Sequence, residues 1–527
     1  MANQALTESY SGGTLAGLAV NHAFDNYLRS SSVEIKSGST SLQAVSYAHD
    51  NAGRLQSVTD ASASSHTATY AYHANSHLIN TLTFTNSGSG NGMVTTKAYD
   101  RLNRLQSIAS NAFGSSAPSL PVSFAYQYNA ANQRIRADLE DGSYWIYQYD
   151  ALGQVVLGRK YWADNTAVDG QQFDYAFDDI GNRTTTGGRT SAVSTYTRNF
   201  LNQYSQRTVS DKADALGVAN PTAGVTVGIQ GGTAYTAARK GDYFHYPLKI
   251  GNNVYPTIEV KSLYGATQTE TGEIFNPPAT ETFTHDADGN LTQDGRWTYL
   301  WDGENRLVEM YRDTSTPTLS SRLRLTFEYD HQGRRIRKTF FTHNGTTWVE
   351  QADTVFLYDG WNLLGELDAN ASNAKLRTYV WGLDLSGTME GGGLPRQSGA
   401  AAGGVRGLLK LTDYTSGTTH HFVAYDGNGN VIALVAGASG AITARYEYGP
   451  FGEPLRRTGN LARNNPFRFS TKFTENESGL VYYGYRYFHP GSAAWLSRDP
   501  QEENGGLNLY LFVQNNPITH VDVLEPV

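Results

Sequence analysis

One short pattern recurs along this chain and limits what the chain can fold into. An aromatic residue is followed by Asp, then by a short polar link containing Gly or Asn, and then by an aliphatic residue. The clear copies begin at Tyr47, Tyr99, Tyr149, Phe177, Trp301, Tyr329, Tyr358 and Tyr425. Self-similarity of this kind is the signature of a repeat architecture, in which one small structural unit is stacked many times.

The residues before each Asp alternate with the period of a β-strand. Leu323, Leu325, Phe327 and Tyr329 share one face, and polar residues lie between them. Such alternation places one face of a strand against a core. The Asp can accept hydrogen bonds from the turn backbone, and the Gly or Asn can adopt the left-handed conformation that closes a turn. Each repeat is therefore predicted to be a β-hairpin.

A single hairpin is marginally stable in water, so the hairpins need neighbours. Stacked in series, they form one long sheet in which each repeat covers the edge of the previous one. The composition agrees with an all-β fold, since 34 Tyr, 21 Phe and 8 Trp favour strands and 54 Gly favour tight turns. The alternative is a set of ordinary β-sandwiches whose turns are similar by chance.

Composition also excludes several classes of function. The chain has no cysteine, which rules out disulfides, thiolate metal sites and cysteine nucleophiles. A net charge of -8 argues against a nucleic-acid partner. No secretory signal is visible at the amino terminus, and the longest apolar run, Val431–Ala436, is too short to span a membrane. We find no phosphate loop, dinucleotide fingerprint or Gly-x-Ser-x-Gly elbow, so no cofactor is predicted.

The carboxyl-terminal part contains an ordered series of more specific motifs. They are Tyr446–Glu453, Asn465–Ser470, Gly479–Tyr487, Trp495–Pro500, Gly505–Tyr510, Asn515–Pro517 and Asp522. With the repeats before it, this series resembles the YD-repeat proteins. These are the bacterial Rhs (rearrangement hotspot) proteins with their Rhs-associated core, the C component of insecticidal toxin complexes, and the shell of the teneurins.

The resemblance implies a spiral of β-hairpins wound into a hollow or partly open shell. In that family the core rolls inward as an end plug, and the shell often holds a toxic carboxyl-terminal segment. The repeat is lost between Ser205 and Glu281, where we predict a small inserted β domain. The predicted parts are a shell over 1–204, the insert over 205–281, a shell over 282–445 and the core over 446–527. A Gly-rich loop is predicted over Gly387–Gly407.

The resemblance also implies one chemical site. Asp499 and Asp522, with Arg498 beside them, resemble the aspartyl autoprotease that separates the toxic segment from the shell. Two nearby carboxylates do not both ionise easily, so one can hold a proton while the other activates water. The sequence departs from the family at the cut motif, which reads Asp522–Pro526, and at Ala493-Ala494. The alternative is that Asp499 and Asp522 only cap turns.

Other constellations are weaker. His73 and His77 lie in strand-rich sequence, where a spacing of four residues does not converge on one metal. His420 and His421 are predicted to point to opposite faces of a strand. Asp286–Asn290 resembles a calcium loop but lacks the final Glu, so we predict a turn. No metal site is predicted, and the tyrosine clusters are assigned to core packing.

The leading hypothesis is a bacterial shell scaffold that encloses or presents its own or a co-encoded carboxyl-terminal effector. It would be exported or displayed at the cell surface as part of a larger protein. A second hypothesis is a module that binds a cell-surface protein or glycan, with the insert as the contact. A third is an enzyme, limited to self-cleavage or to a hydrolase in the shell or insert. At the hairpin length found here, the chain closes only a modest shell, which could be an open half-cage.

Overall fold

The computed structural model describes residues 6–61, 66–188, 193–312, 318–389 and 404–522. The described chain consists of β-strands joined by turns and loops, and its only helical elements are short 3₁₀ turns. These turns are η1 (Gly13–Leu15), η2 (Leu319–Ser321), η3 (Ala369–Ala371), η4 (Phe469–Thr471), η5 (Glu502–Asn504) and η6 (Val513–Asn515). Most of the loop predicted over Gly387–Gly407 falls on residues 390–403, outside the described residues. None of the helices in the described ranges is long and apolar enough to cross a membrane.

The first sheet is antiparallel, and its strands follow the chain from hairpin to hairpin. It contains β1 (Thr7–Ser9), β2 (Leu18–Phe24), β3 (Ser30–Ser37), β4 (Thr40–His49), β5 (Leu55–Asp60), β6 (His66–Tyr72), β7 (Ile79–Asn86), β8 (Gly92–Tyr99), β9 (Leu105–Phe113), β10 (Val122–Tyr128), β11 (Arg134–Leu139), β12 (Tyr144–Tyr149), β13 (Val155–Tyr161), β14 (Ala167–Phe177), β15 (Arg183–Gly187), β16 (Ser194–Arg198), β17 (Tyr204–Thr208) and β25 (Thr280–Thr282).

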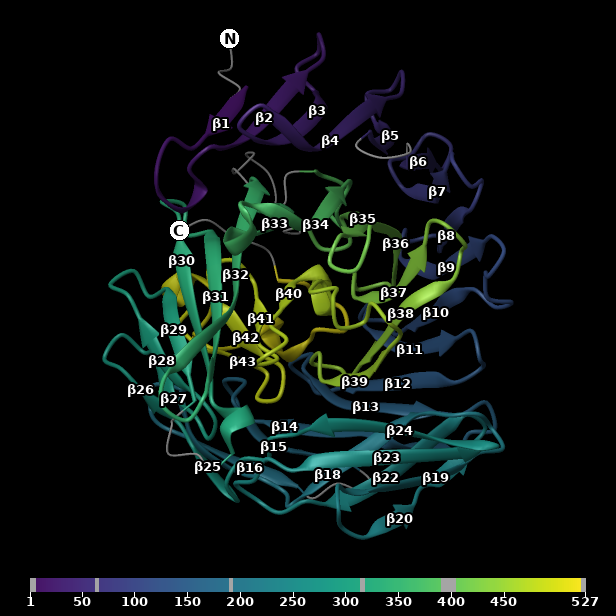
Figure 1. The fold of residues 1–527 in the computed structure, drawn as a ribbon. Coiled ribbons are helices and arrows are strands. Elements are labelled where there is room, and N and C mark those ends of the chain that lie inside the picture. Colours follow the sequence, from purple (N-terminus) through teal and green to yellow (C-terminus); the bar gives the residue numbers. More distant parts are fainter. Residues whose placement is uncertain (1–5, 62–65, 189–192, 313–317, 390–403, 523–527) are drawn as a thin grey trace.

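The second sheet continues the same ribbon. It contains β26 (Thr284–His285), β27 (Leu291–Gln293), β28 (Thr298–Trp301), β29 (Leu307–Tyr311), β30 (Leu323–Tyr329), β31 (Arg335–His343), β32 (Trp348–Asp359), β33 (Asn362–Asp368), β34 (Ala374–Trp381), β35 (Leu408–Asp413), β36 (Thr419–Tyr425), β37 (Val431–Ala436), β38 (Ile442–Tyr448) and β39 (Pro454–Thr458). Strands β26 to β32 complete a ring with the first sheet, and β33 to β39 lie inside it (Figure 1). The predicted all-β spiral of stacked hairpins is confirmed.

The repeated Asp shapes the turn of each hairpin. In the β8–β9 turn, Asp100 Oδ1 accepts from the backbone N–H of Leu102 at 2.8 Å and of Arg104 at 3.0 Å. Its Oδ2 accepts from Arg104 Nε at 2.7 Å, and Asn103 takes a left-handed φ of 60°. Asp50, Asp150, Asp178, Asp302, Asp330 and Asp426 accept the same pair of backbone hydrogen bonds. Each Asp thus satisfies two backbone N–H groups of its own turn.

The repeated aromatic residue joins each hairpin to the one before it. Tyr128 Oη donates to the carbonyl of Leu105 at 2.7 Å, and Tyr425 Oη donates to that of Leu408 at 2.6 Å. Trp301 does the same with its indole N–H, at 2.8 Å from the carbonyl of Leu291. In each case the acceptor is the first residue of a strand in the preceding hairpin. The aromatic and the Asp therefore have separate tasks, one between hairpins and one within a turn.

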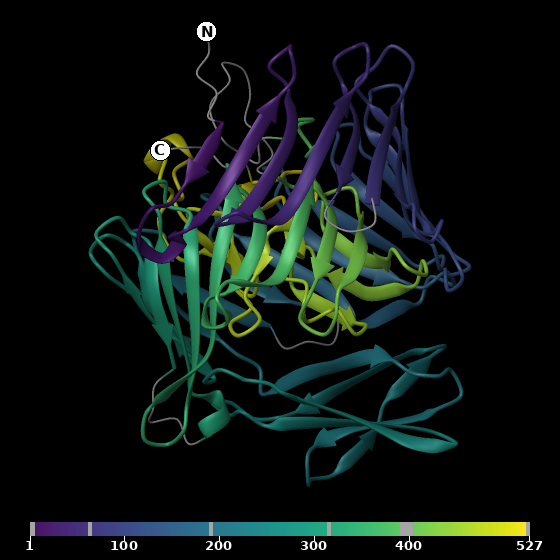
Figure 2. The same cartoon turned by 45° about the horizontal axis from the view of Figure 1, so that its top comes forward.

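The inner strands of the second sheet pack on both faces. Figure 2 shows the first strands of the first sheet lying over β33 to β36. Every residue of β35 is buried, as are the first five of β37, the Val431–Ala436 run. One hydrophobic cluster extends from Val20 and Ile35 of the first sheet through Leu367 to Tyr482 in the core. The space inside the ring is therefore filled at these levels.

The carboxyl-terminal core lies at the centre of the ring (Figure 1). Its small sheet contains β40 (Phe473–Thr474), β41 (Val481–Tyr482), β42 (Tyr487–His489) and β43 (Ala494–Trp495). Glu475 fixes it to the second sheet, because its carboxylate pairs with Arg335 and, at 2.6 Å, with Lys338. Burial alone would raise the pKa of Glu475, but the two cations hold that pKa below its usual value.

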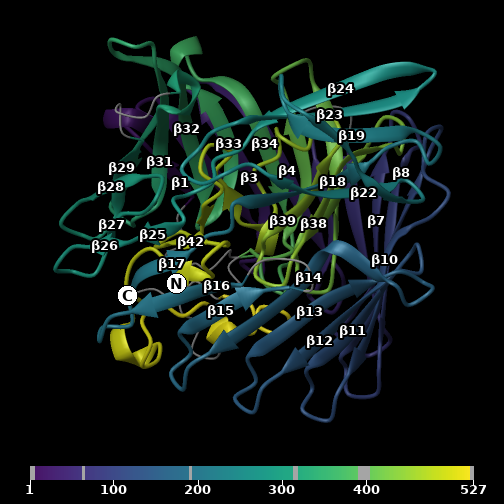
Figure 3. The ribbon, with the colours of Figure 1, turned by 90° about the horizontal axis from the view of Figure 1, so that it is seen from below.

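Two small sheets lie between β17 and β25, which pair directly with each other. One contains β18 (Lys212–Val218), β21 (Ala238–Lys240) and β22 (Tyr243–Lys249); the other contains β19 (Gly224–Ile229), β20 (Ala234–Thr236), β23 (Thr257–Tyr264) and β24 (Ala266–Glu273). They share a hydrophobic cluster of their own, which includes Val227, Phe244 and Leu248. Figure 2 shows them below the ring rather than within it, and Figure 3 shows them from that side, in front of it.

Candidate functional site

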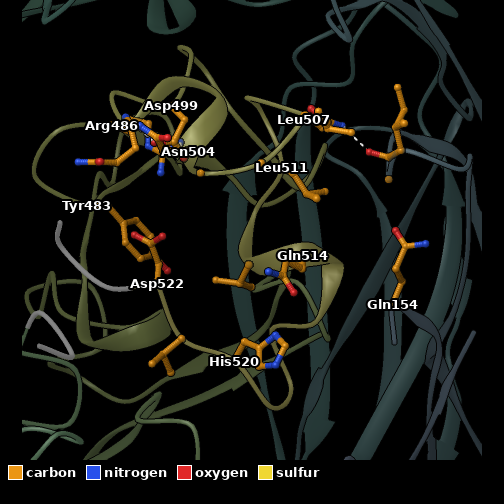
Figure 4. A pocket seen from close by; sticks show the side chains of 18 of the residues that line it. Gln154, Tyr483, Arg486, Asp499, Asn504, Leu507, Leu511, Gln514, His520 and Asp522 are labelled. Carbon is orange, nitrogen blue, oxygen red and sulfur yellow. Dashed lines mark hydrogen bonds and ion pairs between the residues drawn. The ribbon is translucent and has the colours of Figure 1, made fainter. Parts of the chain in front are cut away.

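A cavity of about 860 Å³ lies between the core and the turns of the first sheet. Its lining includes both predicted carboxylates, Asp499 and Asp522, and the turn residues Leu152 and Ile180 (Figure 4). Leu507 completes the mouth and is 78% exposed. The structure therefore brings the two predicted aspartates, 23 positions apart in the numbering, into one cavity.

Hydrogen bonds to the turns of the first sheet hold the segment that carries Asp522. Asn515 Nδ2 donates to the carbonyl of Gly181 at 2.7 Å and to Gln154 Oε1 at 2.8 Å. Asn508 Nδ2 donates to Asn182 Oδ1 at 3.0 Å. Because each contact ends on a hairpin turn, the repeat forms the wall against which the cavity is built.

A turn fixes the position of Asp499. Its Oδ1 accepts from the backbone N–H of Gln501 at 2.9 Å, and its backbone carbonyl accepts from Glu502 N–H at 3.0 Å. Its Oδ2 lies 2.9 Å from Nη1 of Arg486, as an ion pair. Asp499 thus caps a turn, as one sequence interpretation predicted, and at the same time directs a paired carboxylate oxygen toward the cavity.

Arg486 joins the electrostatic environments of the two aspartates. Burial lowers the pKa of its guanidinium, and the charges of Asp499 and Asp522 act against that shift. The guanidinium carbon lies 4.1 Å from the centre of the Trp495 ring, which supports it from one side. Figure 4 shows Arg486 beside Asp499, with Asp522 near Tyr483 on the same side of the cavity.

A second buried cation lies near Asp522. Burial lowers the pKa of the Lys472 amine to about 8, and Asp522 acts against this shift. The amine lies 5.4 Å from the centre of the Tyr483 ring, which also lines the cavity. Two basic side chains, Arg486 and Lys472, thus lie in the electrostatic environment of the two aspartates.

The structure places Arg498 elsewhere. Its side chain packs against the turn before β27, where a methyl group on Gly289 would lie 2.4 Å from Arg498 Nε. Tyr510 Oη donates to the carbonyl of the same Gly289 at 2.8 Å. The arginine that lines the cavity and contacts Asp499 is Arg486. The role expected of Arg498, the sequence neighbour of Asp499, thus falls to a residue on another loop.

Sequence reasoning missed Arg486, although a signal was present. Arg486 stands in the aromatic run Tyr482–Tyr487, where a charged residue needs a buried partner. The weaker candidates take structural places. Asn290 Nδ2 donates to Asp286 Oδ2 at 3.0 Å as in the other turns, and the His420 ring lies 4.3 Å from that of His66. Among the described residues, no group of three or more His, Asp or Glu could hold a metal ion.

The arrangement can support acid–base chemistry on a polypeptide. Two carboxylates line one cavity, with Arg486 paired to Asp499 and Lys472 close enough to Asp522 for the two charges to interact. A carboxylate kept ionised can accept a proton from water, and a second carboxyl group can return a proton to a leaving amine. The segment 523–526, where the family's cut motif would lie, is outside the described residues.

Comparisons with known proteins give partial matches. No family model matches the chain. The tRNA3(Ser)-specific nuclease WapA of Bacillus spizizenii is 29% identical over 247 residues, which is 46% of this chain and 9% of that protein. Toxin protein Tse5 of Pseudomonas aeruginosa is 27% identical over 420 residues, 74% of this chain and 28% of Tse5. Toxin subunit YenC1 of Yersinia entomophaga is 35% identical over 98 residues, 18% of this chain and 10% of YenC1.

The chain thus spans less than a third of the length of each of these three relatives. Among solved structures, the complex TcdB2-TccC3-Cdc42 aligns with 97% of this chain and 26% of its own chain, at 16% identity and a TM-score of 0.39.

Proposed function

Because the chain is a YD-repeat protein of the Rhs class, we propose that it is a toxin-associated shell scaffold that presents a carboxyl-terminal effector at its surface. The relatives named as toxins and toxin subunits support the association with a toxin. The observation that carries the proposal is the place of Asp522, which lines the cavity between the core and the first-sheet turns. Asp522 is the last of the described residues.

Presentation rather than enclosure is favoured by the packing inside the ring. The inner strands are buried on both faces, and one hydrophobic cluster joins the first sheet to the core. Close-packed interiors leave few voids larger than a water molecule. A folded effector therefore has its place outside the packed layers, beside the cavity.

The proposal assigns a task to each predicted part. Residues 1–204 and 282–445 form the wall, 446–527 form the plug that delivers the effector, and 205–281 form an inserted domain beside the wall. We further propose that the whole assembly is exported, since its relatives are named as toxins.

Limited proteolysis tests presentation against enclosure. A small marker domain is fused after residue 527, and the chain is digested under native conditions. Presentation predicts that the marker is cut from the shell as fast as from an unstructured fusion partner, while the shell stays whole. A marker that resists digestion until the shell is unfolded by denaturant would show enclosure and overturn the proposal.

Self-cleavage is a second candidate function, favoured by the pairing of Arg486 with Asp499 in the cavity that also holds Asp522. We propose that these carboxylates cut the polypeptide beyond Asp522. Intact mass of the fused chain is the measurement, with Asp499→Asn and Asp522→Asn as variants and Asp179→Asn, on the cavity wall, as control. Cleavage in the wild type and the control but in neither variant supports the proposal; a wild type that stays whole sinks it.

A further inference from the structure

The turns of the first sheet carry an apolar residue at one repeated position. This residue lies two places after the Asp or Asn that begins the turn. Its backbone N–H donates to the side-chain oxygen of that Asp or Asn. Along five consecutive turns of this type, from β8–β9 to β16–β17, this tip residue is Leu102, Ala131, Leu152, Ile180 and Leu201. Every second connection between consecutive antiparallel strands lies at the same end of a sheet. The five turns are such connections, so they all lie along one rim of the sheet, whose strands run side by side in Figure 3.

These tips are exposed in the folded chain. Leu102 is 67% exposed, Leu152 69% and Leu201 59%, while Ile180 is 37% exposed. Phe200 and Leu507, next to the last two tips, are fully and 78% exposed. Single exposed apolar residues are ordinary, but a contiguous row of them marks an interaction surface.

The second sheet shows that the turn itself does not require an apolar tip. At the same position its turns carry Asp288, Glu304, Gln332 and Asn428. The first three of these are exposed, as the tips of the first sheet are. The tip residues of the two sheets have the same turn geometry and are exposed, but those of the first sheet are apolar and those of the second are polar. This difference indicates that the apolar rim of the first sheet has a partner.

We propose that this rim is the contact surface of a symmetric dimer and that its occupant is the same rim of a second copy of this chain. Neighbouring tips are two strands apart, so they repeat every ~10 Å along the rim. A second copy has the same repeat, and its tips therefore stay in register over the whole row. The six exposed side chains offer roughly 700 Å² of surface, close to the ~800 Å² that each partner contributes to a standard interface.

A two-fold axis at the central tip, Leu152, gives a complementary pairing. Reversing the row places Leu102 opposite Leu201, Leu152 opposite itself, and the small Ala131 opposite the larger Ile180. Such alternation of large and small side chains is what allows close packing. Arg101 then faces Phe200 of the second copy, which suits a cation–π contact.

Most charges of the rim are paired within their own sheet. Asp100 is paired with Arg104 at 2.7 Å, and Asp178 with Arg198 at 2.5 Å. Asp179, beside Ile180, would meet the turn of Asn129 and Asn132, whose amides can donate hydrogen bonds. The axis brings one pair of like charges together, Asp150 and its copy, and Gln154 Nε2 donates to Asp150 Oδ2 at 2.8 Å within each chain.

The full chain tests the proposal by light scattering after gel filtration at micromolar concentration. We expect twice the mass of one chain for the wild type and a single-chain mass for Leu152→Lys, because two lysines would meet on the axis. Gln332→Lys, at the matched tip of the second sheet, is the control and should stay dimeric. Thermal melting of each variant shows that it is folded.

Cysteine cross-linking supplies a second readout, since the chain has no cysteine of its own. Leu152→Cys should form an intermolecular disulfide under mild oxidation at least tenfold faster than Gln332→Cys. A wild type that is monomeric at tens of micromolar overturns the proposal. A dimer that persists in Leu152→Lys, or that cross-links equally through both cysteines, places the interface elsewhere and overturns it as well.

Discussion

Strands β3 and β4 of the first sheet and strands β35 and β37 of the second are built from the same type of hairpin. In the outer pair, buried and more exposed residues alternate, as in a strand with one face toward a core. In the inner pair burial is almost continuous, because the first sheet covers one face and the core covers the other. The hairpin is the same, and the layer in which it lies decides how many of its side chains contribute to stability.

The largest expected effect comes from breaking the ion network between the second sheet and the core. Glu475→Gln removes the charge that pairs with Arg335, which is fully buried, and with Lys338, which keeps its ion pair with Glu477 at 3.0 Å. Leaving buried charges unpaired costs about 3–5 kcal/mol. Denaturant unfolding should show this loss, while the matched outer variant Asp174→Asn, whose ion pair with Arg159 is solvent-exposed, should change stability by less than ~1 kcal/mol. Equal losses of stability in the two variants would mean that the ion pairs with the core contribute no more to stability than an ion pair of the outer sheet.

Cavity formation sharpens the same comparison. Leu434 in β37 is fully buried, and Leu434→Ala should lower the free energy of unfolding by about 3 kcal/mol. Leu300→Ala in β28, where the side chain is 45% exposed, should cost less than ~1 kcal/mol. Chemical denaturation of the two variants measures both values. A small loss at Leu434 would contradict the filled interior.

Acid should weaken the inner strand β36 through His421. Burial lowers the pKa of His421 to about 4, from an ordinary value near 6.5. The unfolded chain therefore takes up a proton that the folded chain refuses, so stability is full above ~6.5 and falls as the pH drops toward 4. The loss amounts to about 2–3 kcal/mol. Melting from pH 7 to 4.5 should show a shallower decline for His421→Gln than for the wild type.

The smallest difference is expected at the turns. Asp100→Ala removes three hydrogen bonds from an outer turn and should cost about 1–2 kcal/mol. Asp426→Ala removes the equivalent bonds from a turn whose Gly427 N–H also donates to Tyr126 Oη of the first sheet. It should therefore cost more. Thermal denaturation of the two variants tests whether the same turn motif contributes differently to stability in the two layers.

The hairpins were predictable because Asp, the left-handed residue and the preceding aromatic each act within one or two neighbouring hairpins. The layering was not predictable, since Tyr99 and Tyr425 begin copies of the same Tyr-Asp motif although their strands lie in different layers. The aspartates of the cavity could be named from the resemblance. Arg486 could not be assigned, because the core has strands of only two or three residues and no period from which a shared face could be read.

The aromatic link between hairpins also has a direction. Tyr128, Trp301 and Tyr425 each donate backward, to a carbonyl nearer the amino terminus. A chain that emerges amino terminus first meets, at each new hairpin, an acceptor that is already in place. The order of layers matches the order of synthesis as well, from ring to inner strands to core. The hairpins can thus be added in the order in which they are synthesised, and the described segment that lines the cavity is placed after the ring and the inner strands.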